Sequence, residues 1–202
     1  MNILAALGWA LAIAATFTAM PQLIHLAKGN RVGIEPLTPA IACVTMVAWI
    51  IFTAAKQDLP AFASSLGPLI IWAITLVLLS YHKVPNWKLA LSLALSLTFI
   101  LSILRIFHIV PVSFFGTISA LGSTLWGIPQ FVKVLRHRKV DLSGVSSLAY
   151  LLLALEGIAW ILYSIGTGII QYALAPLIQV PLFIAITYYA WESKRKIKNS
   201  FL

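Results

Sequence analysis

Charged residues are scarce in this chain of 202 residues. Asp, Glu, Lys and Arg together make up 9% of it, and only five residues are acidic. A soluble globular domain carries about 25% charged residues, so this chain lacks the charge needed to cover a surface in water. Hydrophobic residues make up 61% of the sequence, and the mean hydropathy is +0.98. The composition excludes a soluble enzyme domain and a disordered tail, and it predicts a polytopic membrane protein.

Cysteine is almost absent as well. Cys43 is the single cysteine, so no intramolecular disulfide can form and a secreted disulfide scaffold is excluded. The four histidines, His25, His82, His108 and His137, are scattered without the spacing of metal ligands. No spacing indicates a nucleophile with its base, a phosphate-binding glycine loop or a zinc site. We therefore expect no enzyme activity, no metal and no cofactor.

Long uncharged stretches predict an all-α integral membrane protein with seven transmembrane helices, because a helix needs roughly 20 mostly apolar residues to span a bilayer. Closely spaced glycines favour a turn, and they place the break between the last two spans at residues 164–168. The expected spans are residues 3–25, 37–55, 59–81, 87–108, 112–132 and two within 142–191.

Basic residues support this count. With seven spans, twelve Lys and Arg residues fall on one side of the membrane and only Lys56 and Arg105 on the other. This bias predicts an external N-terminus and a cytoplasmic C-terminus in the plasma (inner) membrane. The same loops account for the net charge of +9, so we expect no nucleic acid as a partner. The basic tail is expected to attract anionic membrane lipid.

An ordered set of landmarks occurs twice. Five residues recur 108 positions later: Gly8, Ala12, Thr16, Pro21 and Gln22 match Gly116, Ala120, Thr124, Pro129 and Gln130. Five more recur at an offset of 111: Gly33, Leu37, Ala48, Trp49 and Ile50 match Gly144, Leu148, Ala159, Trp160 and Ile161. The predicted units are a first three-helix repeat at 1–82, a linker helix at 83–110, a second repeat at 111–192 and a basic tail at 193–202. The linker helix makes the two three-helix repeats parallel, and substrate sites in such transporters lie between the repeats.

Two Pro-Gln pairs end the first helix of each expected repeat. Proline lacks an N–H and clashes with the carbonyl four residues back, so it weakens a helix locally. We expect Pro21, Gln22, Pro129 and Gln130 to serve as hinges for alternating access, and static kinks are the alternative. The glutamines are expected to hydrogen-bond across helices. Three further prolines are expected to interrupt the third helices of the repeats: Pro68, Pro176 and Pro181.

Glu156 is the sharpest chemical feature, because it is the one charged residue within 142–191. It lies near the middle of the sixth expected span, where a carboxylate costs about 2.5–3.5 kcal/mol. No Lys or Arg lies in the middle of any expected span, so a buried ion pair is not expected. Glu156 would hydrogen-bond a substrate, bind a cationic substrate or carry a proton. A neutral acid bonded to a neighbouring Ser, Thr or Gln is the structural alternative.

At these residues the sequence resembles the PQ-loop superfamily and, within it, the SWEET-type sugar transporters. The resemblance covers nearly the whole chain in a three-plus-one-plus-three layout. It is carried by Pro21-Gln22 followed by Lys28, Arg31 and Gly33, by Pro129-Gln130 followed by Arg138-Lys139-Val140-Asp141 and Ser143-Gly144-Val145-Ser146, and by Trp160-Ile161-Leu162-Tyr163.

The resemblance also implies a substrate pocket. In SWEET-like proteins the tryptophan near the end of each repeat's second helix and the residue four before it face the pocket, and an asparagine fifteen residues after the tryptophan contacts the sugar. Here Ser64 and Ala175 stand at the two asparagine positions. The implied pocket residues are Trp49, Trp160, Thr45, Glu156, Ser64 and Ala175.

The leading functional hypothesis is therefore transport of a small polar solute, with a sugar as first candidate through the resemblance. Glu156 and the missing asparagines favour an alternative, a proton-coupled carrier of an amino acid or cationic metabolite. A third hypothesis is a receptor that uses the same fold to bind a partner. The sequence leaves open whether protons take part and whether the chain forms a homo-oligomer.

Overall fold

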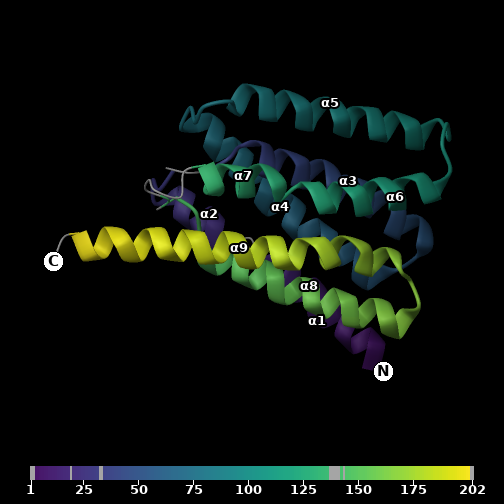
Figure 1. Ribbon diagram of the computed structural model, residues 1–202. Coiled ribbons are helices and arrows are strands. Elements are labelled where there is room, and N and C mark those ends of the chain that lie inside the picture. The colour runs from purple at the N-terminus through teal and green to yellow at the C-terminus, as the bar shows by residue number, and fades with distance from the viewer. Residues whose placement is uncertain (1–2, 19, 32–33, 137–141, 143, 201–202) are drawn as a thin grey trace.

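The computed structural model of the chain describes residues 3–18, 20–31, 34–136, 142 and 144–200, with side chains up to residue 195 (Figure 1). Several residues named above lie outside the described part: Gly33, His137, Arg138, Lys139, Val140, Asp141 and Ser143. The side chains of the basic tail from residue 196 onward lie outside it as well.

The described residues are almost entirely helical, with short connections between helices. The helices are α1 (Ile3–Thr18), α2 (Met20–Ala27), α3 (Leu37–Lys56), α4 (Leu59–Tyr81), α5 (Trp87–Ile106), α6 (Val112–Leu125), α7 (Ile128–Arg136), α8 (Ser147–Thr167) and α9 (Gln171–Ser200).

Six helical segments among the described residues are long and apolar enough to cross a membrane, against the seven spans predicted. The expected first span appears as α1 and α2, which together form one of the six at Ile3–Ala27. The expected fifth span at 112–132 is divided into α6 and α7, and neither piece is long enough by itself. The remaining expected spans correspond to α3, α4, α5, α8 and α9.

The first part of the fifth expected span ends where the Pro-Gln pair predicts. Pro129 cannot donate to the carbonyl four residues back, which belongs to Leu125, and α6 ends at Leu125. Pro129 then occupies the first turn of α7, where a missing N–H costs nothing. Pro21 stands in the same relation to Phe17, and the segment that contains both, Ile3–Ala27, is long enough to cross a membrane.

Two other predictions about helix breaks are wrong. Pro68 lies inside α4, and Pro176 and Pro181 lie inside α9, and both helices continue through them. Packing on neighbouring helices can hold a helix together around a proline in a membrane protein. The turn expected at 164–168 comes later, because α8 continues to Thr167 and ends where Gly168 adopts a φ of +73°, a conformation that glycine tolerates.

Helices distant in sequence pack side by side. α1 packs on α4 and on α8, and α6 packs on α3 and on α9. α4 also packs on α3, and α9 on α8, while α5 lies against α3 and α4 on the outside of the bundle (Figure 1). Each half of the chain thus contributes its first helix to a contact with the second helix of the other half.

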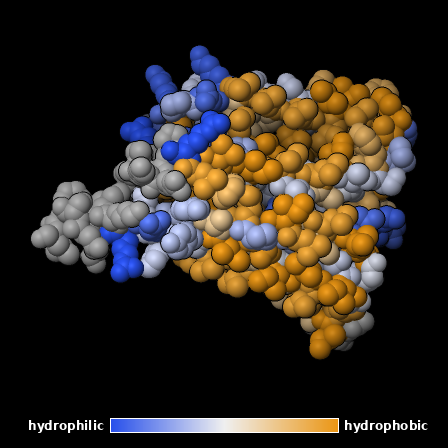
Figure 2. All heavy atoms as spheres, viewed as in Figure 1, coloured by the Kyte–Doolittle hydropathy of each residue, from blue (hydrophilic) through white to orange (hydrophobic). Residues whose placement is uncertain are grey.

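The bundle has a basic end and a far end. The connections α2–α3 and α4–α5 and the last part of α9 lie at the basic end, together with Lys28, Arg31, Lys83 and Lys194. The far end holds the start of α1 and the connections α3–α4, α5–α6 and α8–α9 (Figure 1). In the face shown in Figure 2, hydrophobic residues cover most of the bundle and hydrophilic residues gather at the basic end.

Glycines allow the closest helix contacts. A Cβ added at Gly122 of α6 would lie 2.6 Å from Oγ1 of Thr45 on α3, and one added at Gly67 of α4 would lie 2.2 Å from Oγ1 of Thr16 on α1. Such separations are shorter than real side chains adopt, so these helices approach each other only because Cβ is absent.

We predict that Gly122→Ala destabilises the protein by about 1–2 kcal/mol, because overpacking costs about 1–3 kcal/mol and alanine returns about 0.5–1 kcal/mol of helix propensity. Thr45→Ala removes the clashing oxygen and leaves the next atom, Cβ, 3.6 Å away. Thermal unfolding of both single variants and of the double variant in detergent measures the coupling free energy between positions 45 and 122. The loss should disappear in the Thr45→Ala background, and an equal loss in both backgrounds would contradict the proposed contact.

Candidate substrate cavity

A cavity of about 110 Å³ lies inside the bundle. Its walls come from α1, α3, α4, α6, α8 and α9 and from the connection between α6 and α7. This volume lies below that of the roughly 150 Å³ cavity that holds benzene in a well-studied case. The linker helix α5 contributes no lining residue among those described.

The two halves of the chain contribute equivalent positions to the cavity. With the sequence offset of 108 for the first helix and 111 afterwards, sixteen of its twenty lining residues fall into eight pairs. The pairs are Thr18 and Trp126, Met46 and Gly157, Trp49 and Trp160, Ala61 and Tyr172, Ser64 and Ala175, Ser65 and Pro176, Pro68 and Gln179, and Trp72 and Phe183.

Five of the six residues expected at the pocket line this cavity: Trp49, Trp160, Glu156, Ser64 and Ala175. Thr45, at the position equivalent to Glu156, is not among the lining residues, and it packs against Gly122 of α6 instead. Thr45 thus lies outside the wall of this cavity, and its expected role as a substrate-binding residue stays a prediction. Glu156 therefore has no equivalent residue in the part of the wall that comes from the first half.

Glu156 lies in the middle of α8 and borders the cavity. Its Oε1 accepts a hydrogen bond of 3.1 Å from Nε1 of Trp160, one helical turn away. Among the described residues, no Lys, Arg or His lines the cavity. The carboxyl group thus has a neutral partner and no basic side chain of the described cavity wall to balance a charge.

Aromatic rings form two layers across the cavity. The layer nearer the far end contains Tyr172, whose ring centre lies 5.7 Å from that of Trp49 and 5.5 Å from that of Trp160. The second layer contains Trp126, with ring centres 5.4 Å from Trp72 and 5.0 Å from Phe183. Trp72 and Trp126 also border the cavity, although the sequence resemblance did not imply them as pocket residues.

A contact at the far end was not foreseen from the sequence. The hydroxyl of Tyr172 donates to Oδ2 of Asp58 over 2.5 Å, while Oδ1 of Asp58 accepts from the backbone N–H of Ala61 and caps α4. The N-cap was readable, since Asp58 precedes an apolar run that begins with Leu59-Pro60. Its partner was not, because Tyr172 is 114 residues away in the chain. The bond joins the start of α4 to the start of α9.

Gln22 joins the halves at the basic end. Its Oε1 accepts a hydrogen bond of 2.9 Å from the backbone N–H of Ser146, and its Nε2 donates to the carbonyl of Gly144 over 3.0 Å. Gln22 is buried. The prediction of a bond between helices is therefore refined: the side chain binds the backbone just before α8 begins.

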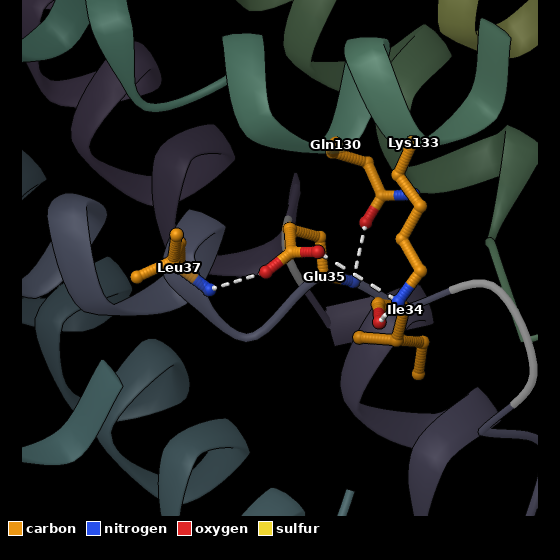
Figure 3. Close-up of polar contacts among 5 residues, drawn as sticks. All are labelled: Ile34, Glu35, Leu37, Gln130 and Lys133. Carbon is orange, nitrogen blue, oxygen red and sulfur yellow. Dashed lines mark hydrogen bonds and ion pairs between the residues drawn. The ribbon is translucent and has the colours of Figure 1, made fainter. Parts of the chain in front are cut away.

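Gln130 makes the equivalent contact from the other half. Its Oε1 accepts a hydrogen bond of 3.0 Å from the backbone N–H of Glu35, just before α3 begins (Figure 3). Lys133 reinforces it, because its Nζ donates to the carbonyl of Ile34 and lies 3.7 Å from Oε2 of Glu35. Glu35 and Ser146 are equivalent positions at an offset of 111. Each glutamine thus binds the same backbone position of the opposite half.

We predict that Gln22→Leu lowers the free energy of unfolding by about 1–3 kcal/mol, since it leaves the N–H of Ser146 and the carbonyl of Gly144 without this partner. Gln22→Glu keeps an acceptor for Ser146 but places an oxygen against the carbonyl of Gly144, so it should also destabilise. Thermal unfolding of both variants in detergent measures the effect. Wild-type stability of both would show that these bonds do not hold the halves together.

Comparison with known proteins identifies part of the chain. Residues 111–172 match the PQ loop repeat family. The matched segment contains Pro129-Gln130, Glu156 and Trp160, and it extends to Tyr172. The chain has no match among curated proteins. The long apolar helices and this repeat indicate an integral membrane protein, and residues 111–172 are similar to a PQ loop repeat.

Proposed function

We propose that the protein transports a small polar solute across the membrane by alternating access of its cavity. The observation that carries the proposal is the cavity wall, built from equivalent positions of both halves of the chain. A site between two like units can face either side of a membrane when one unit rocks against the other.

The moving units in this proposal are two parallel three-helix repeats. The first contains α1 with α2, α3 and α4, the second contains α6 with α7, α8 and α9, and α5 links them. The matching contacts of α1 with α8 and of α6 with α3 support this division. In the proposed arrangement α6 and α7 together form one further span, which follows α5 in the chain and raises the number of spans to seven. The far end, with the N-terminus, then lies outside, and the basic end lies in the cytoplasm.

Separate contacts close the two ends of the cavity. Asp58 and Tyr172 join the repeats at the far end, while Gln22, Gln130 and Lys133 join them at the basic end. Alternating access requires one set to break while the other holds. The helix break beside Pro129 lies next to the basic-end contact of Gln130, so the short helix α7 can move without unfolding α6.

A sugar fits this cavity less well than the sequence resemblance suggested. Its volume of about 110 Å³ lies below the roughly 150 Å³ cavity that holds a six-membered benzene ring in a well-studied case. A hexose would add its hydroxyl groups to a ring of that size. The two expected asparagine positions also hold Ser64 and Ala175, and the hydroxyl of Ser64 donates to the carbonyl of Ala61 in its own helix.

We predict that Glu156→Gln abolishes transport while leaving the fold intact, because the amide keeps the size of the carboxyl group and removes its charge. Counterflow in proteoliposomes, with a panel of labelled amines, amino acids and sugars, measures transport. Glu192→Gln is the matched control, since Glu192 is an acid of the same chain that does not line the cavity. A folded Glu156→Gln protein with wild-type counterflow would remove Glu156 from the mechanism. Saturable binding without counterflow of any solute by the wild type would favour a receptor.

A further inference from the structure

The cavity combines one acid with walls that are mainly aromatic. Four tryptophans border it, Trp49, Trp72, Trp126 and Trp160, and Tyr172 and Phe183 complete the two aromatic layers. Glu156 is the only acidic residue among the described lining residues, and no described basic residue lines the cavity. Aromatic faces attract a cation that lies within about 6 Å of the ring centre, and a carboxylate attracts it more strongly.

The hydrogen-bond donors of the cavity are largely occupied by the protein itself. Indole N–H groups of Trp49 and Trp160 donate to Ser123 and Glu156. Four hydroxyl groups donate to carbonyls of their own helices, namely those of Thr18, Thr53, Ser64 and Ser65. Each of these hydroxyl oxygens keeps acceptor capacity. The wall therefore suits a ligand that donates hydrogen bonds better than one that needs donors from the protein.

A neutral polyol and a zwitterion both fit this wall poorly. A sugar needs donors as well as acceptors. Most of the donors in the wall bond to the protein, and among the lining tryptophans only the indole N–H groups of Trp72 and Trp126 have no hydrogen bond to the described residues. An amino acid carries a carboxylate, which would lie near Glu156 without a basic residue to compensate it. A protonated alkylamine carries only donors, so it matches the acceptors, the acid and the rings. A fully alkylated ammonium ion carries no donor and matches only the acid and the rings.

We infer that the cavity binds a small monovalent organic cation, an alkylammonium ion of about half a dozen non-hydrogen atoms or fewer, through the carboxylate of Glu156 and the two aromatic layers. The size limit follows from the cavity volume of about 110 Å³, which lies below the roughly 150 Å³ cavity that holds benzene. This inference rests on the proposed function only in using the same cavity, since binding can be measured without transport.

Three probes with five non-hydrogen atoms each separate charge from size. tert-Butylammonium is a cation at neutral pH, because an alkylamine of the lysine type has a pKa near ~10.4. tert-Butyl alcohol has the same shape and no charge, and glycine is a zwitterion. Glucose serves as the fourth probe. Titration of the purified protein at constant ionic strength, followed by tryptophan fluorescence, measures binding, because four tryptophans border the cavity.

We expect saturable binding of tert-butylammonium and at least tenfold weaker binding of tert-butyl alcohol, glycine and glucose. Glu156→Gln should weaken cation binding at least tenfold, and Glu192→Gln should not change it. Glu156→Asp provides a second variant that keeps the charge on a shorter side chain, and it should retain the preference for the cation over the alcohol. The comparison of probes on the wild type needs no variant.

Equal affinity for tert-butylammonium and tert-butyl alcohol would overturn the inference, and so would unchanged cation binding by folded Glu156→Gln. Saturable binding of glucose or glycine in preference to the cation would overturn it as well. Counterflow distinguishes this failure from failure of the proposed function. Cation binding without flux of any solute would support the inferred ligand class and contradict transport. Glucose flux without cation binding would support transport and contradict the inferred ligand class.

Discussion

The structure depends on two glutamine side chains that hold backbone groups of the opposite half of the chain. Gln22 binds the N–H of Ser146 and Gln130 binds the N–H of Glu35, at equivalent positions before α8 and α3. Backbone groups at a helix start have no partner within the helix, and within or beside a bilayer each must find one. Each glutamine directly follows a proline, and in the second half that proline lies just after the end of α6.

The cavity follows from the same geometry. When first helices pack on second helices of the opposite half, equivalent residues meet around a shared space, and sixteen lining residues fall into equivalent pairs. Glu156 departs from this equivalence, since Thr45 at the matching position fills a contact with Gly122. A single acid among aromatic walls gives the site a charge preference that a symmetric wall would lack.

The sequence predicted much of this arrangement because its signals are periodic or repeated. Hydropathy located most of the helices, and the duplicated Trp49 and Trp160 indicated positions that do border the cavity. The contact of Thr45 with Gly122 could not be predicted, because the sequence does not reveal which neighbouring helix packs against a given helix face, and Gly122 lies on another helix. The hydrogen bond between Asp58 and Tyr172 was not predicted, because a contact between residues distant in the chain leaves no local signal in the sequence. The helix breaks predicted at Pro68 and Pro176 are absent, because packing on neighbouring helices holds α4 and α9 together where proline weakens them.

Accessibility of the cavity from each side of the membrane tests the central claim most directly. A cysteine at Ser65, in a Cys43→Ser background, reports access of a membrane-impermeant thiol reagent. Tyr172→Phe removes the bond at the far end and Lys133→Met removes the ion pair at the basic end. A lost bond of about 0.5–1.5 kcal/mol should raise labelling roughly two- to tenfold, from the far side for the first variant and from the basic side for the second. Increases from the same side in both variants would contradict two-ended closure of a shared cavity.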